Sequence, residues 1–202
     1  MRVLSQSTAP TIEPLSLAEV LDHLKISAGT EDQYVTALIT AARQWTEHYL
    51  RRQLLTATWL LELDKWPTAE EWPGAWIRLD WPPVASVTHV KYYDTNGALQ
   101  TLASSNYQVD VATLGGRIVL ASGASLPTLQ STKIKAIQIT FTAGYGAAAS
   151  AVPMPIRQAM LLLIGDMYEN REAQIVGTIV AENRTAMMLL GPYRYLNFEG
   201  NS

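Results

Sequence analysis

The chain of 202 residues contains no cysteine. This absence excludes disulfide bonds, thiolate metal sites and cysteine nucleophiles. The three histidines, His23, His48 and His89, are isolated, because none has another potential metal ligand two to four residues further on. The sequence also lacks a Gly-x-Ser-x-Gly elbow, a Walker phosphate loop and a Gly-x-Gly-x-x-Gly motif. We therefore predict a protein that is not an enzyme and that has no catalytic, cofactor-binding or metal-binding residues.

An excess of charge of one sign is also missing. Charged residues make up only 16% of the chain and the formal net charge is −3, against a usual charged fraction of ~25%. Acidic and basic residues are spread evenly along the sequence. No segment is basic enough to form a phosphate-binding patch, so a dedicated nucleic-acid-binding module is not expected.

Long hydrophobic runs are absent. The longest apolar run covers the six residues 159–164, whereas a helix needs about 20 apolar residues to cross a bilayer. The first residues, Met1 to Ser5, lack the apolar stretch of a signal peptide. We expect a soluble protein with no membrane partner that is made inside the cell.

Residues 1–52 carry helical signals. Ser16 and Glu19 have the spacing of a capping box before the apolar pattern of residues 17–26. Thr30 and Gln33 suggest a second capping box, and residues 31–52 repeat apolar side chains every three or four positions. Two helices are predicted in this zone.

Residues 53–152 carry strand signals. Alternating or β-branched stretches occur at 56–63, 76–80, 87–93, 107–110, 117–120 and 133–141. Asn96-Gly97 after the third stretch is typical of a β-hairpin turn. The spacing predicts a small antiparallel sandwich or barrel, followed by a return linker at 142–152.

Residues 153–202 are helical again, with helices predicted at 155–172 and 183–190, a mobile loop at 173–182 and an extended C-terminal tail. The predicted fold class is therefore α+β. The N- and C-terminal helices form a small bundle, and an antiparallel β-sandwich or barrel-like module is inserted between them.

Two features favour self-association. Nine of the thirteen residues from Ile156 to Tyr168 are apolar, which predicts a helix buried on most faces. The tail after Pro192 is aromatic and has no predicted element to pack in. Gly165, inside the helix, suggests a close approach of another backbone.

Six tryptophans stand against two phenylalanines, and four of them lie between residues 66 and 81. Exposed rings on a β-module can stack on sugars, so a glycan-binding module is an alternative function. The interpretation that we favour is that the rings fill a small core or a subunit contact.

Three stretches together resemble the head–tail connector (adaptor or neck) proteins of long-tailed bacteriophages and prophages. They are residues 14–25, residues 167–172 with the sequence Met-Tyr-Glu-Asn-Arg-Glu, and residues 188–194 with the sequence Met-Leu-Leu-Gly-Pro-Tyr-Arg. The order of elements, with a β-insert between the second and third helices, is also similar to that family.

The resemblance implies a structural virion protein. Such a protein forms a ring, expected to be a dodecamer, below the portal. The ring connects the DNA-filled head to the tail and extends the DNA channel. It is assembled in the bacterial cytoplasm, and its expected partners are the portal protein, a downstream neck or tail-completion protein, and double-stranded DNA passing without sequence-specific binding. A different neck or tail-completion ring protein is the alternative within the same biology.

The resemblance also suggests residues for the oligomer and portal interfaces. Arg171, between Glu169 and Glu172, is expected to form a charge-paired knot within or between subunits, or else an exposed ion pair of little energy. Pro192 is expected to end the last helix and direct the tail outward. The full candidate set is Tyr168, Glu169, Arg171, Glu172, Pro192, Tyr193, Arg194, Tyr195 and Phe198.

Overall fold

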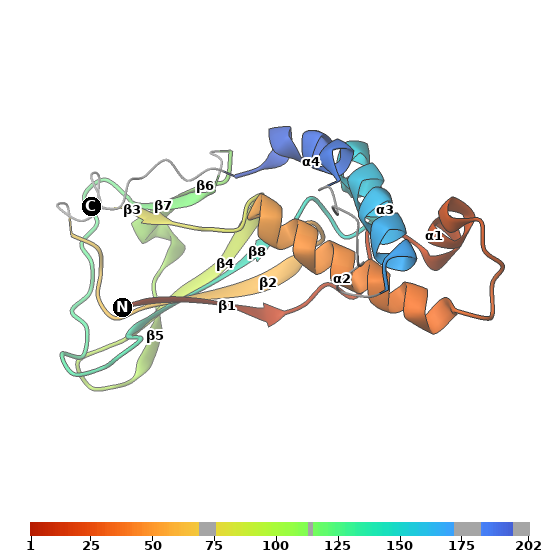
Figure 1. The fold of residues 1–202 in the computed structure, drawn as a ribbon. Coiled ribbons are helices and arrows are strands. Elements are labelled where there is room, and N and C mark those ends of the chain that lie inside the picture. Colours follow the sequence, from red (N-terminus) through yellow and green to blue (C-terminus); the bar gives the residue numbers. More distant parts are fainter. Residues whose placement is uncertain (69–75, 113–114, 172–182, 196–202) are drawn as a thin grey trace. The chain divides into compact units, whose positions relative to one another are not determined.

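The computed structural model describes residues 1–68, 76–112, 115–171 and 183–195, and these residues form two compact units. Unit 1 contains residues 1–10 and 56–145, and unit 2 contains residues 11–55 and 146–202. The described part of the chain is a mixture of helices and antiparallel sheets (Figure 1). The predicted α+β class is confirmed.

Unit 1 contains two antiparallel sheets, of five and three strands. The five-stranded sheet has the order β1 (Arg2–Thr8), β2 (Ala57–Leu63), β8 (Ile137–Ala143), β4 (Val84–Tyr93) and β5 (Leu99–Thr101). The three-stranded sheet has the order β3 (Trp76–Arg78), β7 (Arg117–Leu120) and β6 (Tyr107–Asp110), and a short 3-10 turn covers Ser104–Asn106.

Alternation along the central strands builds the core of unit 1. Every second residue of β8, from Ile137 to Ala143, is buried, and in β2 Trp59 lies opposite Phe141 of β8. Ile77 and Ile118 of the three-stranded sheet belong to the same buried cluster. The two sheets therefore share one core, as in a sandwich, and neither sheet is closed into a barrel.

The hairpin signal is confirmed. β4 pairs antiparallel with β5, and Gly97 lies between them with a φ of 80°. The Asp94 carboxylate accepts hydrogen bonds from the backbone N–H groups of Asn96 and Ala98 at 2.9 and 3.0 Å. These bonds join residues at most four positions apart, so they favour the turn locally.

Two strand predictions need correction. No strand is predicted before residue 10, yet β1 pairs along its length with β2. The stretch 133–141 is predicted as one strand, but β8 begins only at Ile137. Lys135 has a left-handed φ of 54°, and its N–H donates to Asp64 at 2.8 Å, so the chain turns there instead of extending.

Unit 2 contains the helices of the described residues. These are α1 (Leu17–Leu24), α2 (Asp32–Leu50), α3 (Met154–Glu169) and α4 (Arg184–Leu190), with 3-10 turns at Ala149–Ala151 and Gly191–Tyr193. The Ser16–Glu19 capping box is present in both directions. The second predicted box is wrong, because α2 begins at Asp32 after Glu31 and has no side-chain cap. The mobile loop predicted at 173–182 lies outside the described residues.

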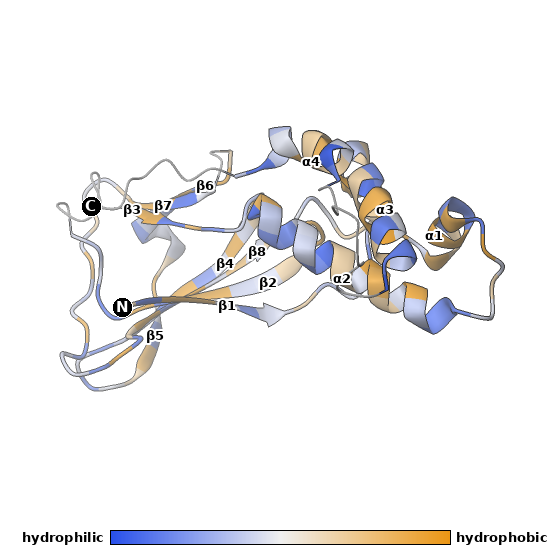
Figure 2. Ribbon diagram, in the orientation of Figure 1, coloured by the Kyte–Doolittle hydropathy of each residue, from blue (hydrophilic) through white to orange (hydrophobic). Residues whose placement is uncertain are grey.

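Much of the apolar helix α3 is covered within the chain itself. It contacts α1, α2 and α4, and its residues Ile156, Ala159, Met160 and Ile164 are fully buried. Figure 2 shows hydrophobic residues along α3 and α4 and a mixture of polar and hydrophobic residues along α2. The prediction that this helix needs a separate chain to bury it is therefore corrected. Among the described residues, a Cβ at Gly165 would meet only the His23 side chain, at 3.8 Å, and no backbone of another element.

A buried polar network crosses the α2 face of unit 2. Arg43 donates to Glu13 at 2.6 Å and to Glu47 at 2.9 Å. The other oxygen of Glu47 accepts from the Gln53 side chain at 2.6 Å and from the Leu54 N–H at 3.0 Å. The network ties the segment before α1 and the segment after α2 to one helix face.

Candidate interaction surfaces

The end of α3 carries a cluster formed by Tyr168, Arg171, Glu31 and Tyr34, which we name the α3-end cluster. Arg171 donates to the Glu31 carboxylate at 2.7 Å, and the Tyr168 hydroxyl donates to the other oxygen of Glu31. The Arg171 guanidinium lies 4.7 Å from the ring centroid of Tyr34 and 4.8 Å from that of Tyr168. Two aromatic rings and one carboxylate therefore hold this arginine at the start of α2.

The hydrogen bonds shift the pKa values inside the α3-end cluster. Donation by Tyr168, and then by Arg171, lowers the pKa of Glu31. The bond to Glu31 raises the pKa of Tyr168 and that of Arg171. These shifts favour an ionised Glu31 and protonated Tyr168 and Arg171, which are the states that form the hydrogen bonds. Half of the Arg171 side chain remains exposed to solvent, so the cluster lies on the surface of unit 2.

The ion pair that the structure shows for Arg171 has a partner that the sequence analysis does not name. Arg171 pairs with Glu31, which lies 140 positions earlier in the sequence. Glu169 is exposed, and Glu172 lies outside the described residues. Sequence reasoning missed Glu31 and Tyr34. The signal available was an acidic residue and an aromatic residue one turn apart at the predicted start of α2.

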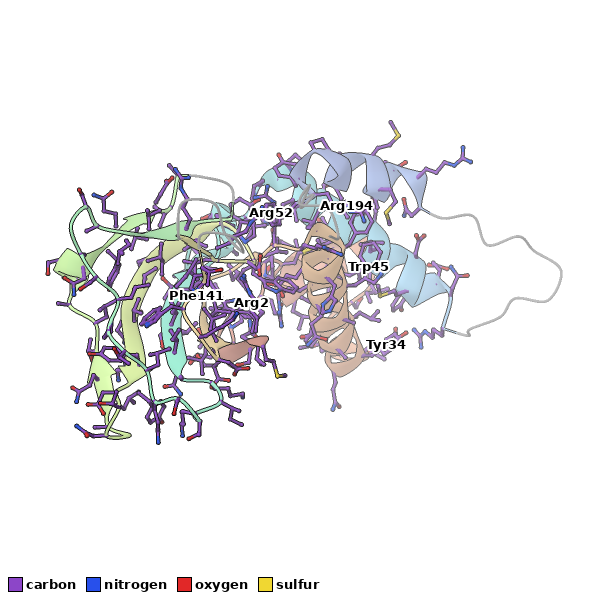
Figure 3. The ribbon with its side chains drawn as sticks, turned by 90° about the vertical axis from the view of Figure 1, so that its left-hand side faces the viewer. Arg2, Tyr34, Trp45, Arg52, Phe141 and Arg194 are labelled. Atoms are coloured by element: carbon purple, nitrogen blue, oxygen red, sulfur yellow. The ribbon has the colours of Figure 1, made fainter. Side chains whose placement is uncertain are left out.

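A second group of candidate residues lies at the other end of α2, where the C-terminal segment returns. The Tyr195 N–H donates to the Leu50 carbonyl at 2.8 Å, and the Arg52 side chain donates to the Tyr193 carbonyl. The Arg194 guanidinium lies 5.1 Å from the ring centroid of Tyr49. We name these residues the C-terminal cluster, and Figure 3 shows Arg52 and Arg194 near one end of α2 and Tyr34 near the other.

An exposed aromatic stack extends the C-terminal cluster along α2. Trp45 lies parallel to Tyr49, with ring centroids 5.2 Å apart and planes 7° apart. Trp45 is 38% exposed. A tryptophan held flat in this way presents apolar surface with little rotamer entropy left to lose on binding.

Tyr195 is not part of a free tail. It is only 4% exposed and its N–H donates to the Leu50 carbonyl, which corrects, for this one residue, the expectation that the aromatic tail has no element to pack against. Pro192 and Arg194 are exposed and Tyr193 is half-buried. Phe198 lies outside the described residues. Of the predicted site residues, Tyr168 and Arg171 belong to the α3-end cluster, and Tyr193, Arg194 and Tyr195 belong to the C-terminal cluster. Tyr34 and Tyr49, which mark them, are separated by about 22 Å of helix.

The tryptophans of unit 1 mostly serve its core. Trp59 is buried and stacks on Trp81 with ring centroids 5.1 Å apart. Trp66 packs on the same core and donates its ring N–H to the Pro127 carbonyl at 2.9 Å. Trp66 and Trp81 are half-buried against this core, so part of each ring packs inside unit 1. Trp72 and the side chain of Trp76 lie outside the described residues.

The same unit has a small apolar pocket among core side chains. Its lining includes Trp66, Ile77, Val90, Leu102, Tyr107 and Ile118. The lining offers few groups that could orient a polar ligand. Within the described residues, no group of three or more histidines and carboxylates could hold a metal ion. No helix in this part of the chain has the length and apolar character that crossing a bilayer requires.

The structure is similar over almost its whole length to chains from gene transfer agent particles. A chain from the neck of an empty particle, computed with C6 symmetry, has a TM-score of 0.77 and 28% identity, and 98% of each chain is covered. A chain from the virion of a native particle has a TM-score of 0.78 and 27% identity, with the same coverage. A chain from the neck of a native particle, computed with C12 symmetry, has a TM-score of 0.71 and 29% identity, again over 98% of both chains.

No protein-family model matches the chain, and the search of curated proteins gave no match. The match to neck chains covers both units, so it concerns the whole combination of a β-sandwich and a helical unit. The resemblance to head–tail connector proteins that the sequence suggests is confirmed by this structural match to proteins of phage-like necks.

Proposed function

We propose that this chain is a structural subunit of the neck of a phage-like particle. Copies of it form a ring below the portal, which connects the DNA-filled head to the tail and extends the DNA channel. The observation that carries this proposal is the similarity over 98% of both chains to proteins of gene transfer agent necks. A likeness of one unit alone would support only a shared fold, whereas here both units and their order along the chain are shared.

The proposed ring contains twelve copies. A ring with twelvefold symmetry also has sixfold symmetry, so the C6 and C12 symmetries of the two matched necks are both compatible with one dodecameric ring. Cyclic rings form when two different surfaces of one subunit bind each other head to tail. Each subunit must therefore offer two separate surfaces to its neighbours.

The charge of the chain suits a DNA channel. The formal net charge is −3 and the basic residues are dispersed. A basic lining would bind the duplex through many phosphate contacts and would slow its passage. A ring built from these subunits lets the duplex slide.

The two clusters of unit 2 suit a protein that joins different partners. The α3-end cluster and the C-terminal cluster lie at opposite ends of α2, so one subunit can contact two components at once. We assign the exposed Pro192 and Arg194, with the Trp45 stack beside them, to the contacts with the portal or a neighbouring subunit. The α3-end cluster is then available for the neighbour on the other side or for the next neck protein.

Removal of the gene from cells that produce the particles tests this function. We expect DNA-filled heads that lack tails, and restoration of tailed particles when the wild-type gene is supplied on a plasmid. Electron microscopy of purified particles, with an affinity tag on the protein detected at the neck, provides the measurement. Tailed particles of normal number in the absence of the gene would contradict the proposal.

Two other gene deletions, analysed by the same microscopy, distinguish a connector from a tail-completion protein. A connector binds the filled head first, so it should be present on tailless heads from cells that lack the tail genes. A tail-completion protein should instead be found on free tails from cells that lack the portal.

A further inference from the structure

Strand β1 forms one open edge of the five-stranded sheet. Among the described residues no strand lies beyond it. The Asp64 N–H donates to the Met1 carbonyl at 3.2 Å. Because hydrogen-bonded pairs alternate along an antiparallel ladder, the N–H and C=O of Leu4 face away from β2, toward the open edge.

The β1 edge lacks most of the features that protect edges from pairing. The other edge strands, β3, β5 and β6, are three or four residues long, whereas β1 has seven residues. From Val3 to Thr8 it has no charged residue and no proline. Its protective features are the charged Arg2 at its first position and a register shift between Gln6 and Thr8. A long, uncharged edge is a template for another extended segment.

The chain has a segment suited to this edge. Residues 196–199 have the sequence Leu-Asn-Phe-Glu, which alternates apolar and polar side chains as a strand does. They lie outside the described residues and directly follow Tyr195, which is buried and bonded to the Leu50 carbonyl. The tail therefore starts from a fixed point of unit 2. Its four alternating residues span about 13 Å when extended, which matches the stretch from Val3 to Gln6.

The two faces of β1 fit that alternation. Leu4 packs against the core of unit 1 but is only half-buried, so a neighbouring strand with apolar side chains on the same face would cover it. Ser5 lies on the opposite face of β1 and is exposed. A tail strand with Leu196 and Phe198 beside Leu4 would place Asn197 and Glu199 on this polar face.

We propose that residues 196–199 of one copy add as a further strand to the β1 edge of a second copy. This inference rests on the proposed ring, in which each subunit gives its tail to one neighbour and receives a tail from the other. Backbone hydrogen bonds supply the affinity of such strand addition, and the alternating side chains supply its specificity. The exchange is head to tail, so it can close into a ring.

The absence of cysteine allows a clean test, because every disulfide must come from engineered residues. Cells that produce the particles co-express a tagged Asn197→Cys chain with an untagged Ser5→Cys or Ser7→Cys chain, and purified particles are oxidised. Ser5 and Ser7 cover two registers. The matched control is Gln100→Cys, which lies on β5, the exposed edge at the other side of the same sheet.

The expected result is a heterodimer of tagged and untagged chains with Ser5→Cys or Ser7→Cys, seen on a non-reducing gel, and none with Gln100→Cys. The strand exchange would be overturned by necks that contain both variants but give no heterodimer. It would also be overturned by an equal yield of heterodimer with Gln100→Cys. Neither result would contradict the proposed function. A further variant carries Asn197→Cys and Ser5→Cys in the same chain. If a disulfide forms only within that chain and never between two chains, the tail does not come from a second copy. Particles whose necks lack the protein would contradict the ring itself.

A binding experiment avoids any dependence on disulfide geometry. A labelled synthetic peptide with the sequence of residues 194–202 is titrated against the protein without residues 196–202. We expect saturable binding, weakened about tenfold or more in a peptide carrying Phe198→Asp, because the ring no longer covers Leu4. No binding of the unchanged peptide, or equal binding of both peptides, would overturn the proposal.

Discussion

Replacing Arg43 with methionine tests the buried polar network of unit 2. The Arg43 side chain is 10% exposed and that of Glu47 is 8% exposed. Methionine keeps most of the length of the side chain but removes the charge and both carboxylate contacts. Glu47 is then left as a buried carboxylate whose remaining partners are the Gln53 side chain and the Leu54 N–H.

The expected loss follows from the burial of the pair. Breaking a buried ion pair by removing one partner costs about 3–5 kcal/mol of stability. Glu47 retains two hydrogen bonds and can also take up a proton, and both of these reduce the cost. We therefore expect a loss of about 3 kcal/mol at neutral pH, near the lower end of that range.

The loss should depend on pH in a defined direction. Burial raises the pKa of Glu47 above its ordinary value of 4.5, although the Leu54 N–H and Arg43 lower it. A raised pKa in the folded state means that the folded protein binds the proton more tightly than the unfolded chain. The stability from this proton is fully present below pH 4.5 and is lost as the pH rises through the folded-state pKa. Without Arg43 the pKa rises further, so the difference between variant and wild type should grow from acid to neutral pH.

Urea unfolding followed by circular dichroism at 222 nm measures this, because the described helices all belong to unit 2. The double variant Arg43→Met, Glu47→Gln cannot ionise at position 47, so its loss relative to wild type should not grow from acid to neutral pH. The control is Lys25→Met, which removes an ion pair to Asp22 whose side chains are 78% and 84% exposed and should cost at most about 1 kcal/mol. A loss for Arg43→Met no larger than that of the control would refute the assignment of a stabilising role to the network.

Three further variants test single features of unit 2. Gly165→Ala should stabilise α3 by up to about 1 kcal/mol, because in the described part of the chain the added Cβ meets only the His23 side chain, at ordinary contact distance; a lower urea midpoint would show that the helix needs this glycine. Ser16→Ala should cost about 1 kcal/mol, since it removes the hydroxyl that accepts the Glu19 N–H, while the bond from the Ser16 N–H to the Glu19 carboxylate remains; an unchanged midpoint would contradict the capping role of the hydroxyl. Glu31→Gln should remove an acid-dependent opening of the last turn of α3: the lowered pKa of Glu31 means that its contribution is present above pH 4.5 and is lost as the pH falls. Hydrogen exchange of Tyr168 and its neighbours, corrected for intrinsic rates, should therefore depend on pH in the wild type and not in the variant.

The features that the sequence predicts well are those that a few neighbouring residues determine. The Ser16–Glu19 capping box forms because both of its hydrogen bonds lie within one turn. The hairpin at Asn96-Gly97 forms because Asp94 bonds the N–H groups of the turn. The regular apolar spacing of α2 likewise needs only its own period to be recognised.

Only part of the candidate site could be predicted from neighbouring residues. Tyr168 and Arg171 lie three positions apart in the sequence and contact each other in the structure. Their partners, Glu31 and Tyr34, lie more than 130 positions away, and no local signal identifies such a pairing. The same holds for Tyr195. The sequence predicts that it belongs to a free tail, whereas in the structure its N–H donates to the Leu50 carbonyl.

Local bonding and periodicity in the sequence determine most of the helices and strands, the hairpin and the class of the fold, because the energies that select them act within a few residues. The tertiary structure decides which surfaces are left for other molecules. It brings β1 into the sheet, because the first residues find a partner in β2 about 55 positions later. It packs α3 against helices of its own chain, and it leaves the edge of β1, uncharged from Val3 to Thr8, and two clusters at the ends of α2 on the surface.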